Sequence, residues 1–242
     1  MGSTGVAAIV NQVIITGASA GIGMDTARQF IAAGWAVTNL SRRPCPVDGV
    51  HQVTCDFADP GAVADACVVL ADQAAAASRT VLVHNASLLQ NDRAGEVDAA
   101  TFARVLQINL GAPNALNSAV LPHMRAGSSV IYVGSTLAEK AVGNSYSYVT
   151  TKHAMIGMMR ATCQDLAGRG IHTACVCPGF TDTEMLRSHI GTDPETEQAV
   201  AGMSAFGRLI KPTEIAEAIV WAATHPVING AVLHANLGQV ER

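Results

Sequence analysis

The chain alternates short apolar runs with longer stretches in which apolar residues recur at helical spacing. The short runs are rich in Val and Ile and almost continuously apolar, which is typical of parallel strands covered by helices on both faces. They predict strands at residues 10–15, 36–40, 50–55, 80–84, 129–134, 171–177 and 232–235. The longer stretches predict helices at residues 23–33, 60–77, 99–124, 148–167 and 212–223.

This order predicts right-handed βαβ units and an α/β fold, a Rossmann-type doubly wound parallel sheet of about seven strands with helices on both faces. No repeat, linker or low-complexity tract divides the chain, so we expect a single domain over residues 1–242. The segment 184–206 lies between the sixth strand and the last helix without a clear strand of its own. A long segment of this kind commonly closes over a ligand, so we predict a substrate lid there.

Composition narrows the classes of function. The formal net charge is -4 and the basic residues are scattered, which argues against nucleic acid as a partner. No apolar run is long enough to span a bilayer, and residues 1–5 do not resemble a signal peptide. We interpret the six cysteines as reduced thiols in a cytoplasmic protein, and no Cys or His spacing predicts a metal site.

Glycines and polar residues follow the predicted strands. Open α/β sheets bind ligands beyond the carboxyl ends of their strands, so residues at those ends form one candidate site. In this chain they are residues 16–23, 41–43, Asp56, residues 84–87, Ser135, Pro178 and Gly179. The sequence therefore predicts a ligand site along a single edge of the sheet.

The first of these loops carries Gly17, Gly21 and Gly23 between a strand and a helix. Gly17 permits a tight turn, Gly21 allows the backbone to approach a pyrophosphate, and Gly23 lets the helix close on the sheet. Phosphates bind favourably at a helix N-terminus, where N–H groups and the helix dipole attract anions. An ordinary strand–helix turn is the alternative, but this position favours a nucleotide.

The end of the second strand indicates which nucleotide. It offers Arg42 and Arg43 and no acidic residue, and guanidinium groups bind a 2′-phosphate that a carboxylate would repel. We therefore predict NADP(H) over NAD(H), with a solvated surface turn as the alternative. After the third strand, Asp56 is a candidate partner for the adenine amino group, or else a helix N-cap near Pro60.

Tyr148 and Lys152 stand four residues apart in a predicted helix, thirteen residues after Ser135. Residues at this spacing share one helix face, so the ammonium of Lys152 lies near the phenol of Tyr148. A nearby positive charge favours the phenolate, so we expect Lys152 to lower the pKa of Tyr148. Ser135 is a candidate hydrogen-bond donor to an oxygen bound beside this pair.

Taken together, these motifs resemble the short-chain dehydrogenase/reductase family, from about Gln12 to Gln239. The matching residues are Thr16, Gly17, Gly21, Ile22, Gly23, Asn85, Ala86, Asn109, Ser135, Tyr148, Lys152, Pro178, Gly179 and Thr183. The chain departs from the family's Asn-Asn-Ala-Gly at residues 84–87, where Ser87 adds a side chain close to the expected cofactor. It departs again at residues 236–238, where the usual turn is Asp-Gly-Gly.

The resemblance implies a role for each residue of the catalytic group. Tyr148 would be the acid/base at the carbonyl oxygen, and Lys152 would also bind the nicotinamide ribose. Ser135 would orient the carbonyl, and Asn109 would hold a water that relays protons from Lys152 to solvent. Asn109 could instead cap the helix that runs to residue 124.

The resemblance also gives the expected cofactor site, in which Asn85 and Ala86 would line the adenosine ribose and Thr183 would contact the carboxamide. The full predicted set is Gly17, Ser19, Ala20, Gly21, Ile22, Gly23, Arg42, Arg43, Asp56, Phe57, Asn85, Ala86, Tyr148, Lys152, Pro178, Gly179, Thr181 and Thr183. We expect the substrate pocket to be lined by Leu88, Leu89, Leu137, Ala138, Val142, Asn144 and the lid.

The predicted activity is reversible NADPH-dependent reduction of a ketone or 3-oxoacyl-type carbonyl by hydride transfer, in a homo-oligomer, tetramer or dimer. Two alternatives stay open at this point. One is an NAD-dependent alcohol dehydrogenase, and the other is a catalytically silent nucleotide-sensing protein. Cofactor preference separates the first from the prediction, and turnover separates the second.

Overall fold

The computed structural model describes residues 10–191 and 193–240. Residues 1–5, where we expected no signal peptide, lie outside the described part of the chain. No helix in the described ranges is long and apolar enough to cross a membrane. All six cysteines are free thiols.

The described residues form one parallel sheet with the strand order β3-β2-β1-β4-β5-β6-β7. The strands are β1 Asn11–Thr16, β2 Ala36–Ser41, β3 Val50–Thr54, β4 Arg79–His84, β5 Ser129–Val133, β6 His172–Pro178 and β7 Ala231–Ala235. Each lies within one residue of its predicted bounds at either end. The order reverses between β1 and β4, which is the switch point where such sheets bind ligands. The predicted α/β fold is thus confirmed.

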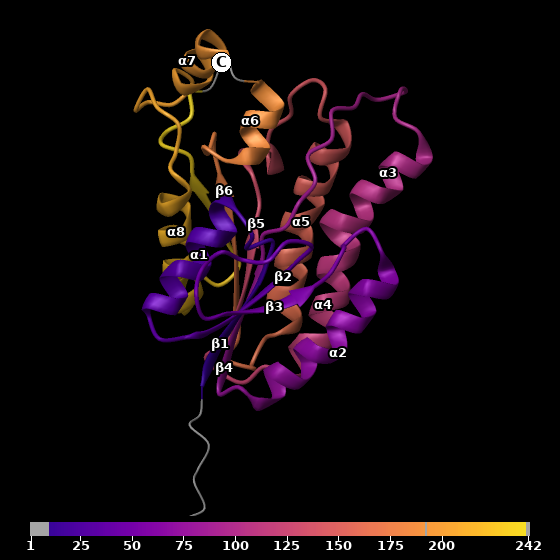
Figure 1. Cartoon of the computed structure of the whole chain (residues 1–242), viewed down its shortest axis with the longest axis vertical. Helices are drawn as coiled ribbons and strands as arrows, with labels where there is room; N and C mark the ends of the chain where they lie inside the picture. The colour runs from indigo at the N-terminus through magenta and orange to yellow at the C-terminus, as the bar shows by residue number, and fades with distance from the viewer. Residues whose placement is uncertain (1–9, 192, 241–242) are drawn as a thin grey trace, which may run out of the picture.

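Helices cover both faces of the sheet (Figure 1). On one face α1 Gly21–Ala32 and α8 Pro212–Thr224 pack against alternate strand residues such as Val13 and Ile131. On the other, α2 Pro60–Ala76, α4 Ala112–Val120 and α5 Tyr146–Asp165 pack against the intervening set. Aliphatic side chains on both faces are withdrawn from water, and their burial is the main source of stability.

The single helix predicted over residues 99–124 is wrong in detail. The chain forms α3 Ala99–Leu106, a π-helical turn Gln107–Gly111, α4, and a 3-10 turn Leu121–His123. Pro113 has no N–H to donate and its ring crowds the carbonyl four residues earlier, so the regular hydrogen-bond ladder is broken there. Wide turns of this type commonly occur at functional sites, and this one contains Asn109.

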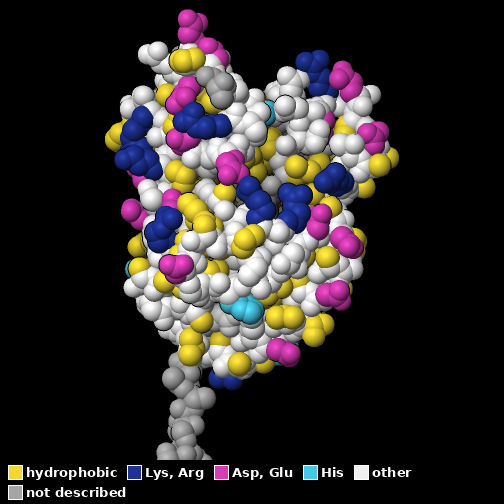
Figure 2. Space-filling model, in the orientation of Figure 1, with side chains coloured by type: hydrophobic (Ala, Val, Ile, Leu, Met, Phe, Trp, Pro, Cys, Tyr) yellow, Lys and Arg dark blue, Asp and Glu magenta, His cyan; other side chains and the backbone are white. Residues whose placement is uncertain are grey.

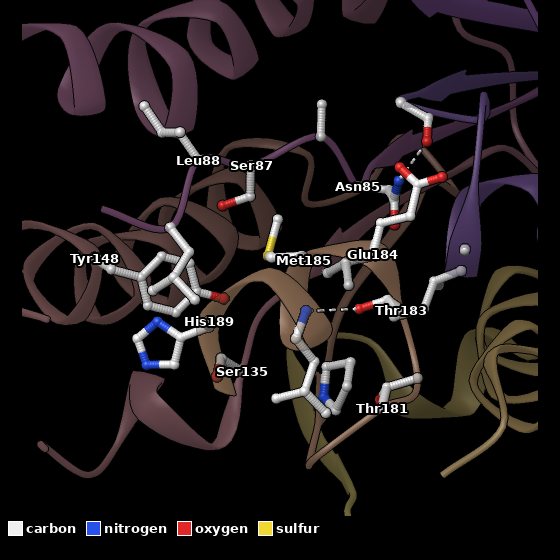
Figure 3. A pocket seen from close by; sticks show the side chains of 18 of the residues that line it. Asn85, Ser87, Leu88, Ser135, Tyr148, Thr181, Thr183, Glu184, Met185 and His189 are labelled. Carbon is white, nitrogen blue, oxygen red and sulfur yellow. Dashed lines mark hydrogen bonds between the residues drawn. The ribbon is translucent and has the colours of Figure 1, made fainter. Parts of the chain in front are cut away.

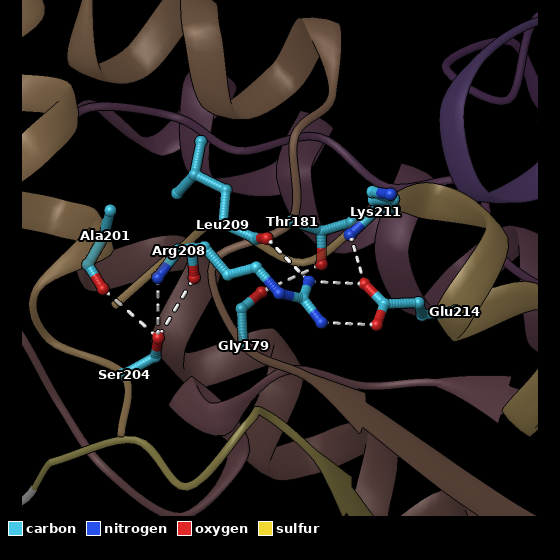
Figure 4. Close-up of polar contacts among 8 residues, drawn as sticks. All are labelled: Gly179, Thr181, Ala201, Ser204, Arg208, Leu209, Lys211 and Glu214. Carbon is cyan, nitrogen blue, oxygen red and sulfur yellow. Dashed lines mark hydrogen bonds and ion pairs between the residues drawn. The ribbon is translucent and has the colours of Figure 1, made fainter. Parts of the chain in front are cut away.

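The segment predicted to be a lid contains α6 Glu184–Ile190 and α7 Pro194–Ala201. Beyond it, Arg208 donates two hydrogen bonds of 2.7 Å to the two carboxylate oxygens of Glu214 (Figure 4). Glu214 also accepts a hydrogen bond from the backbone N–H of Lys211, which caps α8. The carboxyl-terminal end of this segment is therefore tied to the start of a core helix. Elsewhere in the described chain, short 3-10 turns lie at Thr136–Ala138 and Pro226–Ile228.

Candidate active site

A cavity of about 510 Å³ opens at the carboxyl edge of the sheet. Its walls come from segments that follow the strands and from α6, whose Glu184, Met185 and His189 lie among the other lining residues in Figure 3. Of the predicted site residues, those that line it are Gly17, Ser19, Ala20, Gly21, Ile22, Arg42, Arg43, Asp56, Phe57, Asn85, Ala86, Ser135, Tyr148, Lys152, Pro178, Gly179, Thr181 and Thr183. Gly23 and Asn109 lie behind the wall rather than in it.

Two positions of the glycine loop disfavour any residue with a side chain, one because of its backbone angle and one because of close packing. Gly17 has a φ of +74°, which residues with a Cβ rarely adopt. A Cβ on Gly23 would lie 2.4 Å from the carbonyl oxygen of Gly17 and 2.6 Å from Nδ2 of Asn85. The loop therefore brings bare backbone to the cavity, as a phosphate site needs.

Helix α1 begins in this loop, and its N-cap residue Ala20 provides no side-chain cap. The first N–H groups of the helix thus lack the side-chain acceptor that usually satisfies them. A pyrophosphate bound there would supply that acceptor and would gain from the helix dipole. The arrangement of these backbone groups fits a dinucleotide.

Four hydrogen bonds join the glycine loop to the turn after β4. Thr16 Oγ1 accepts from the N–H groups of Asn85 and Ala86, each at 2.9 Å. The Asn85 side chain donates to the carbonyl oxygens of Thr16 and Gly17 at 2.9 and 3.1 Å. These contacts fix the two loops as one rigid wall. Thr16 matches the resemblance, but no pattern in the sequence indicated this bridging role.

The end of β2 carries its two arginines at the cavity rim. Arg43 forms a 3.0 Å ion pair with Glu184, the first residue of α6. Arg42 lines the same cavity and has no carboxylate partner among the described residues. Asn39, in contrast, is buried and accepts from the N–H of Ala18 at 2.8 Å, so it holds the glycine loop. Lys and Arg side chains also gather near the middle of the face drawn in Figure 2.

The wall beyond β3 contains Asp56 and Phe57. Helix α2 is capped by Asp59, whose side chain accepts from the N–H of Gly61 at 2.8 Å. The alternative reading of Asp56 as the helix cap is therefore wrong. Asp56 instead accepts from the N–H of Ala58 at 3.0 Å within its own turn. The guanidinium-bearing Arg104 also lines this end of the cavity, and the sequence analysis did not identify it.

Tyr148, Lys152 and Ser135 meet in one buried corner of the cavity. Tyr148 is 8% and Lys152 only 2% exposed. Lys152 Nζ donates a 2.8 Å hydrogen bond to the carbonyl oxygen of Val133 and lies 5.4 Å from the centre of the Tyr148 ring. The Ser135 hydroxyl accepts from the N–H of Leu137 at 3.1 Å, so its own proton remains available for donation. The three groups can thus act on one substrate oxygen.

Burial governs the ionisation of this pair. Burial raises the pKa of Tyr148 to about 12, opposed by its interaction with the Ser135 hydroxyl. Burial also lowers the pKa of Lys152 to about 8. The pKa of Tyr148 therefore lies above its ordinary value and not below it, contrary to the prediction, because desolvation of the phenolate is the largest effect. At neutral pH the corner holds a protonated phenol beside a mainly charged ammonium.

Asn109 supports this corner from behind. It is fully buried, and its side chain accepts from the N–H of Leu88 at 2.8 Å and donates to the Leu88 carbonyl oxygen at 3.0 Å. Its Nδ2 also donates to Thr151 Oγ1 at 2.9 Å, and Thr151 donates to the carbonyl of Tyr148. Asn109 therefore joins the loop after β4 to α5, and the alternative of a helix cap is wrong.

The start of α5 is fixed by a residue far away in the sequence. Asp92 accepts hydrogen bonds from both the backbone N–H and the hydroxyl of Ser147. The backbone of Asp92 also exchanges hydrogen bonds with Asn144 and Tyr146. A carboxylate at a helix N-terminus satisfies its N–H groups and complements its dipole. This contact explains why α5 begins two residues before the predicted position, and no sequence pattern indicated it.

The loop after β6 closes the remaining side. A Cβ on Gly179 would lie 2.9 Å from that of Asn236, so this loop packs tightly on the C-terminal segment. Thr181 is buried and donates to the carbonyl of Gly179 at 3.1 Å. Thr183 caps α6 by accepting from the N–H of Leu186, and it packs against Gly21. Thr183 thus sits where the first turn of α6 meets the glycine loop.

The other end of the cavity is mostly apolar. Of the predicted pocket residues, Leu88, Leu89, Leu137 and Val142 line it. Ala138 and Asn144 do not line it, since Ala138 is buried and Asn144 faces a separate cavity of about 340 Å³. The lid segment adds Met185, Leu186, His189 and Met203 to this lining, and the C-terminal segment adds Gln239; the sequence did not identify these residues individually. The lid segment supplied no periodic signal from which inward-facing residues could be identified.

Comparison with known proteins agrees with this arrangement. A family described as enoyl-(acyl carrier protein) reductase matches residues 17–239. The chain is 31% identical to a cis-4-hydroxycyclohexanecarboxylate dehydrogenase of Sinomonas cyclohexanicum, over 93% of this chain and 94% of that protein. It is 26% identical to the 3-oxoacyl-[acyl-carrier-protein] reductase MabA of Mycobacterium tuberculosis, over 95% and 93%. An aldohexose dehydrogenase structure from Thermoplasma acidophilum superimposes with a TM-score of 0.86 at 26% identity, over 95% and 93%.

Proposed function

Because the chain belongs to the short-chain dehydrogenase/reductase family, whose members are oxidoreductases of carbonyl and alcohol groups, we propose that it is an NADPH-dependent carbonyl reductase. Its substrate is a ketone or 3-oxoacyl-type carbonyl, and the reaction is reversible. The observation that carries the proposal is the meeting of Tyr148, Lys152 and Ser135 in one buried corner. The names of the dehydrogenase and 3-oxoacyl reductase relatives support this reaction class.

In the reductive direction Tyr148 is the proton donor. Its pKa of about 12 keeps the phenol protonated at neutral pH, and the alkoxide formed from a ketone is a stronger base still. The Ser135 hydroxyl accepts from the N–H of Leu137, which leaves its O–H free to donate a hydrogen bond to the same substrate oxygen. Reduction should therefore be rapid at neutral pH, whereas oxidation of the alcohol, which needs the phenolate, should accelerate as the pH rises.

Lys152 steadies the charge left on Tyr148. Its hydrogen bond to Val133 anchors the ammonium 5.4 Å from the centre of the phenol ring. With a pKa of about 8, the side chain is mainly charged at neutral pH and loses its charge in mildly alkaline solution. We expect reduction to slow above that pH, as the phenolate loses its electrostatic partner.

The nicotinamide cofactor supplies the hydride when bound. The glycine loop and the uncapped start of α1 would hold its pyrophosphate, since bare backbone and unsatisfied N–H groups lie there. The preference for NADP(H) rests on Arg42 and Arg43, which line the cavity without an acidic residue beside them on β2. Arg43 is paired with Glu184, so Arg42 is the more available cation.

Two further expectations belong to this proposal. The segment 184–206 acts as the lid, because Met185, Leu186, His189 and Met203 of this segment line the cavity. The protein assembles as a homo-oligomer, tetramer or dimer, in which α5 contributes to a subunit interface. Sedimentation of a monomer at micromolar concentration would contradict the second expectation.

The test is oxidation of NADPH and NADH in parallel by purified protein, over a panel of ketones and 3-oxoacyl thioesters, with Tyr148→Phe as the control. Turnover with NADPH that disappears in the variant supports the proposal. Turnover with NADH alone would instead favour an NAD-dependent dehydrogenase. Tight nucleotide binding without turnover of any carbonyl would instead favour a nucleotide-sensing protein. The acid/base group formed by Tyr148, Lys152 and Ser135 argues against that alternative, because a sensor does not need it.

A further inference from the structure

Ser87 stands in the turn after β4, between two residues whose backbone is fixed. On one side the N–H of Ala86 donates to Thr16 Oγ1 at 2.9 Å. On the other, the N–H and carbonyl of Leu88 are both bonded to the side chain of Asn109, at 2.8 and 3.0 Å. The direction of the Ser87 side chain is thus set by the fold before any ligand binds.

The hydroxyl of Ser87 is unsatisfied. Its Oγ is buried and makes no hydrogen bond to any residue in the described ranges. A buried hydroxyl without a partner is unfavourable, and neighbouring buried hydroxyls such as those of Thr16 and Thr151 are paired. Figure 3 shows this oxygen pointing into the cavity on the same side as the Tyr148 phenol, with the Met185 sulfur between them in that view. The missing partner is therefore expected in the cavity.

We propose that the Ser87 hydroxyl is a substrate-binding group that hydrogen-bonds a second oxygen of the substrate, close to the reacting carbonyl. The inference rests on the proposed function, because it assumes that the first oxygen lies at Ser135 and Tyr148. The adjoining Leu88, Leu89 and Met185 side chains offer no strong hydrogen-bonding group to such an oxygen. The preferred substrates are thus ketones with a neighbouring hydroxyl or carbonyl oxygen, such as hydroxyketones and 3-oxoacyl thioesters.

The experiment compares substrates that differ only in that second oxygen. Acetoin is paired with butanone, and benzoin with deoxybenzoin. Ser87→Ala removes the hydroxyl, Ser87→Thr keeps it, and Ser118→Ala is the control, since Ser118 is an exposed hydroxyl bonded within α4. We expect Ser87→Ala to lower kcat/KM about tenfold for acetoin and benzoin alone, as loss of one hydrogen bond predicts. Ser87→Thr should recover most of this loss.

Binding measurements separate this inference from the proposed function. The same ketone pairs are titrated by calorimetry into NADP-loaded Tyr148→Phe protein, with and without Ser87→Ala. A selective loss of affinity for the oxygenated ketones supports the role of Ser87 even if no ketone is turned over, an outcome that would overturn the reductase proposal instead. Three results would overturn the role assigned to Ser87. They are an equal loss of affinity of Ser87→Ala for both ketones of a pair, unchanged affinity for both, and weakened binding of NADPH itself.

Discussion

Replacing Lys152 with Met tests the electrostatics of the active-site corner. The side chain is 2% exposed, and burial lowers its pKa from 10.5 to about 8. A shift of this size means that holding the ammonium in the fold costs about 3 kcal/mol relative to the unfolded chain at neutral pH. That cost is part of the wild-type stability and is absent from Lys152→Met.

The pH dependence of the difference follows from the sign of the shift. Below the folded pKa both the folded and the unfolded Lys152 are protonated, so the full cost applies. As the pH rises from 8 toward 10.5, the folded side chain loses its proton while the unfolded one keeps it, and the cost disappears. We therefore expect the stability of the wild type to rise relative to Lys152→Met by about 2 to 3 kcal/mol between about pH 7 and about pH 10.

The assay is urea unfolding of both proteins without cofactor at the two pH values, with Arg160→Met as the control. Arg160 is an exposed cation on the same helix, so its replacement should give a difference that does not vary with pH. Lys152→Met also loses the hydrogen bond to Val133, but this loss lowers the unfolding free energy at both pH values and so cancels from the comparison between them. A gap between wild type and Lys152→Met that is constant, or that moves in favour of the variant at high pH, would refute the reasoning.

Two more predictions concern the cofactor side. Gly23→Ala places a Cβ 2.4 Å from the Gly17 oxygen and 2.6 Å from Asn85 Nδ2, so we expect a loss of about 2 kcal/mol in unfolding free energy and more than tenfold weaker NADPH binding. Unchanged thermal stability and nucleotide titration would contradict it. Glu184→Gln frees Arg43 and should tighten NADPH, but not NADH, by up to about threefold at low salt, because the pair is well exposed. Equal changes for both nucleotides would exclude an interaction of Arg43 with the 2′-phosphate.

The sheet was accessible to sequence reasoning because its strands are buried. The strands β5 and β6 are buried along their whole length and carry mostly apolar residues, so a simple pattern locates them to within a residue. Parallel strands also end at one edge, which is why Gly17, Ser135 and Pro178 could be assigned to one site before their positions were known.

Features that depend on contacts between distant segments were not accessible. The hydrogen bond of Asp92 with Ser147 and the ion pair of Arg43 with Glu184 each join a loop to a distant helix, and sequence periodicity gives no sign of either contact. The direction of the Tyr148 pKa depends on how much water surrounds the phenol, and residue spacing does not report burial. The π-helical turn was missed although Pro113 is visible in the sequence, because the apolar period continues through it.

The hydrogen bonds between Asp92 and the start of α5 limit which changes of loop length this protein can tolerate. Surface loops generally tolerate insertions and deletions, and the stretch after β4 looks like such a loop in the sequence. Here its length determines where Asp92 meets Ser147, and so where the helix bearing Tyr148 and Lys152 begins. Changing that length by a residue would displace the acid/base pair without altering any residue that touches the substrate. In protein engineering this loop should therefore be treated as part of the active site, with its length kept constant.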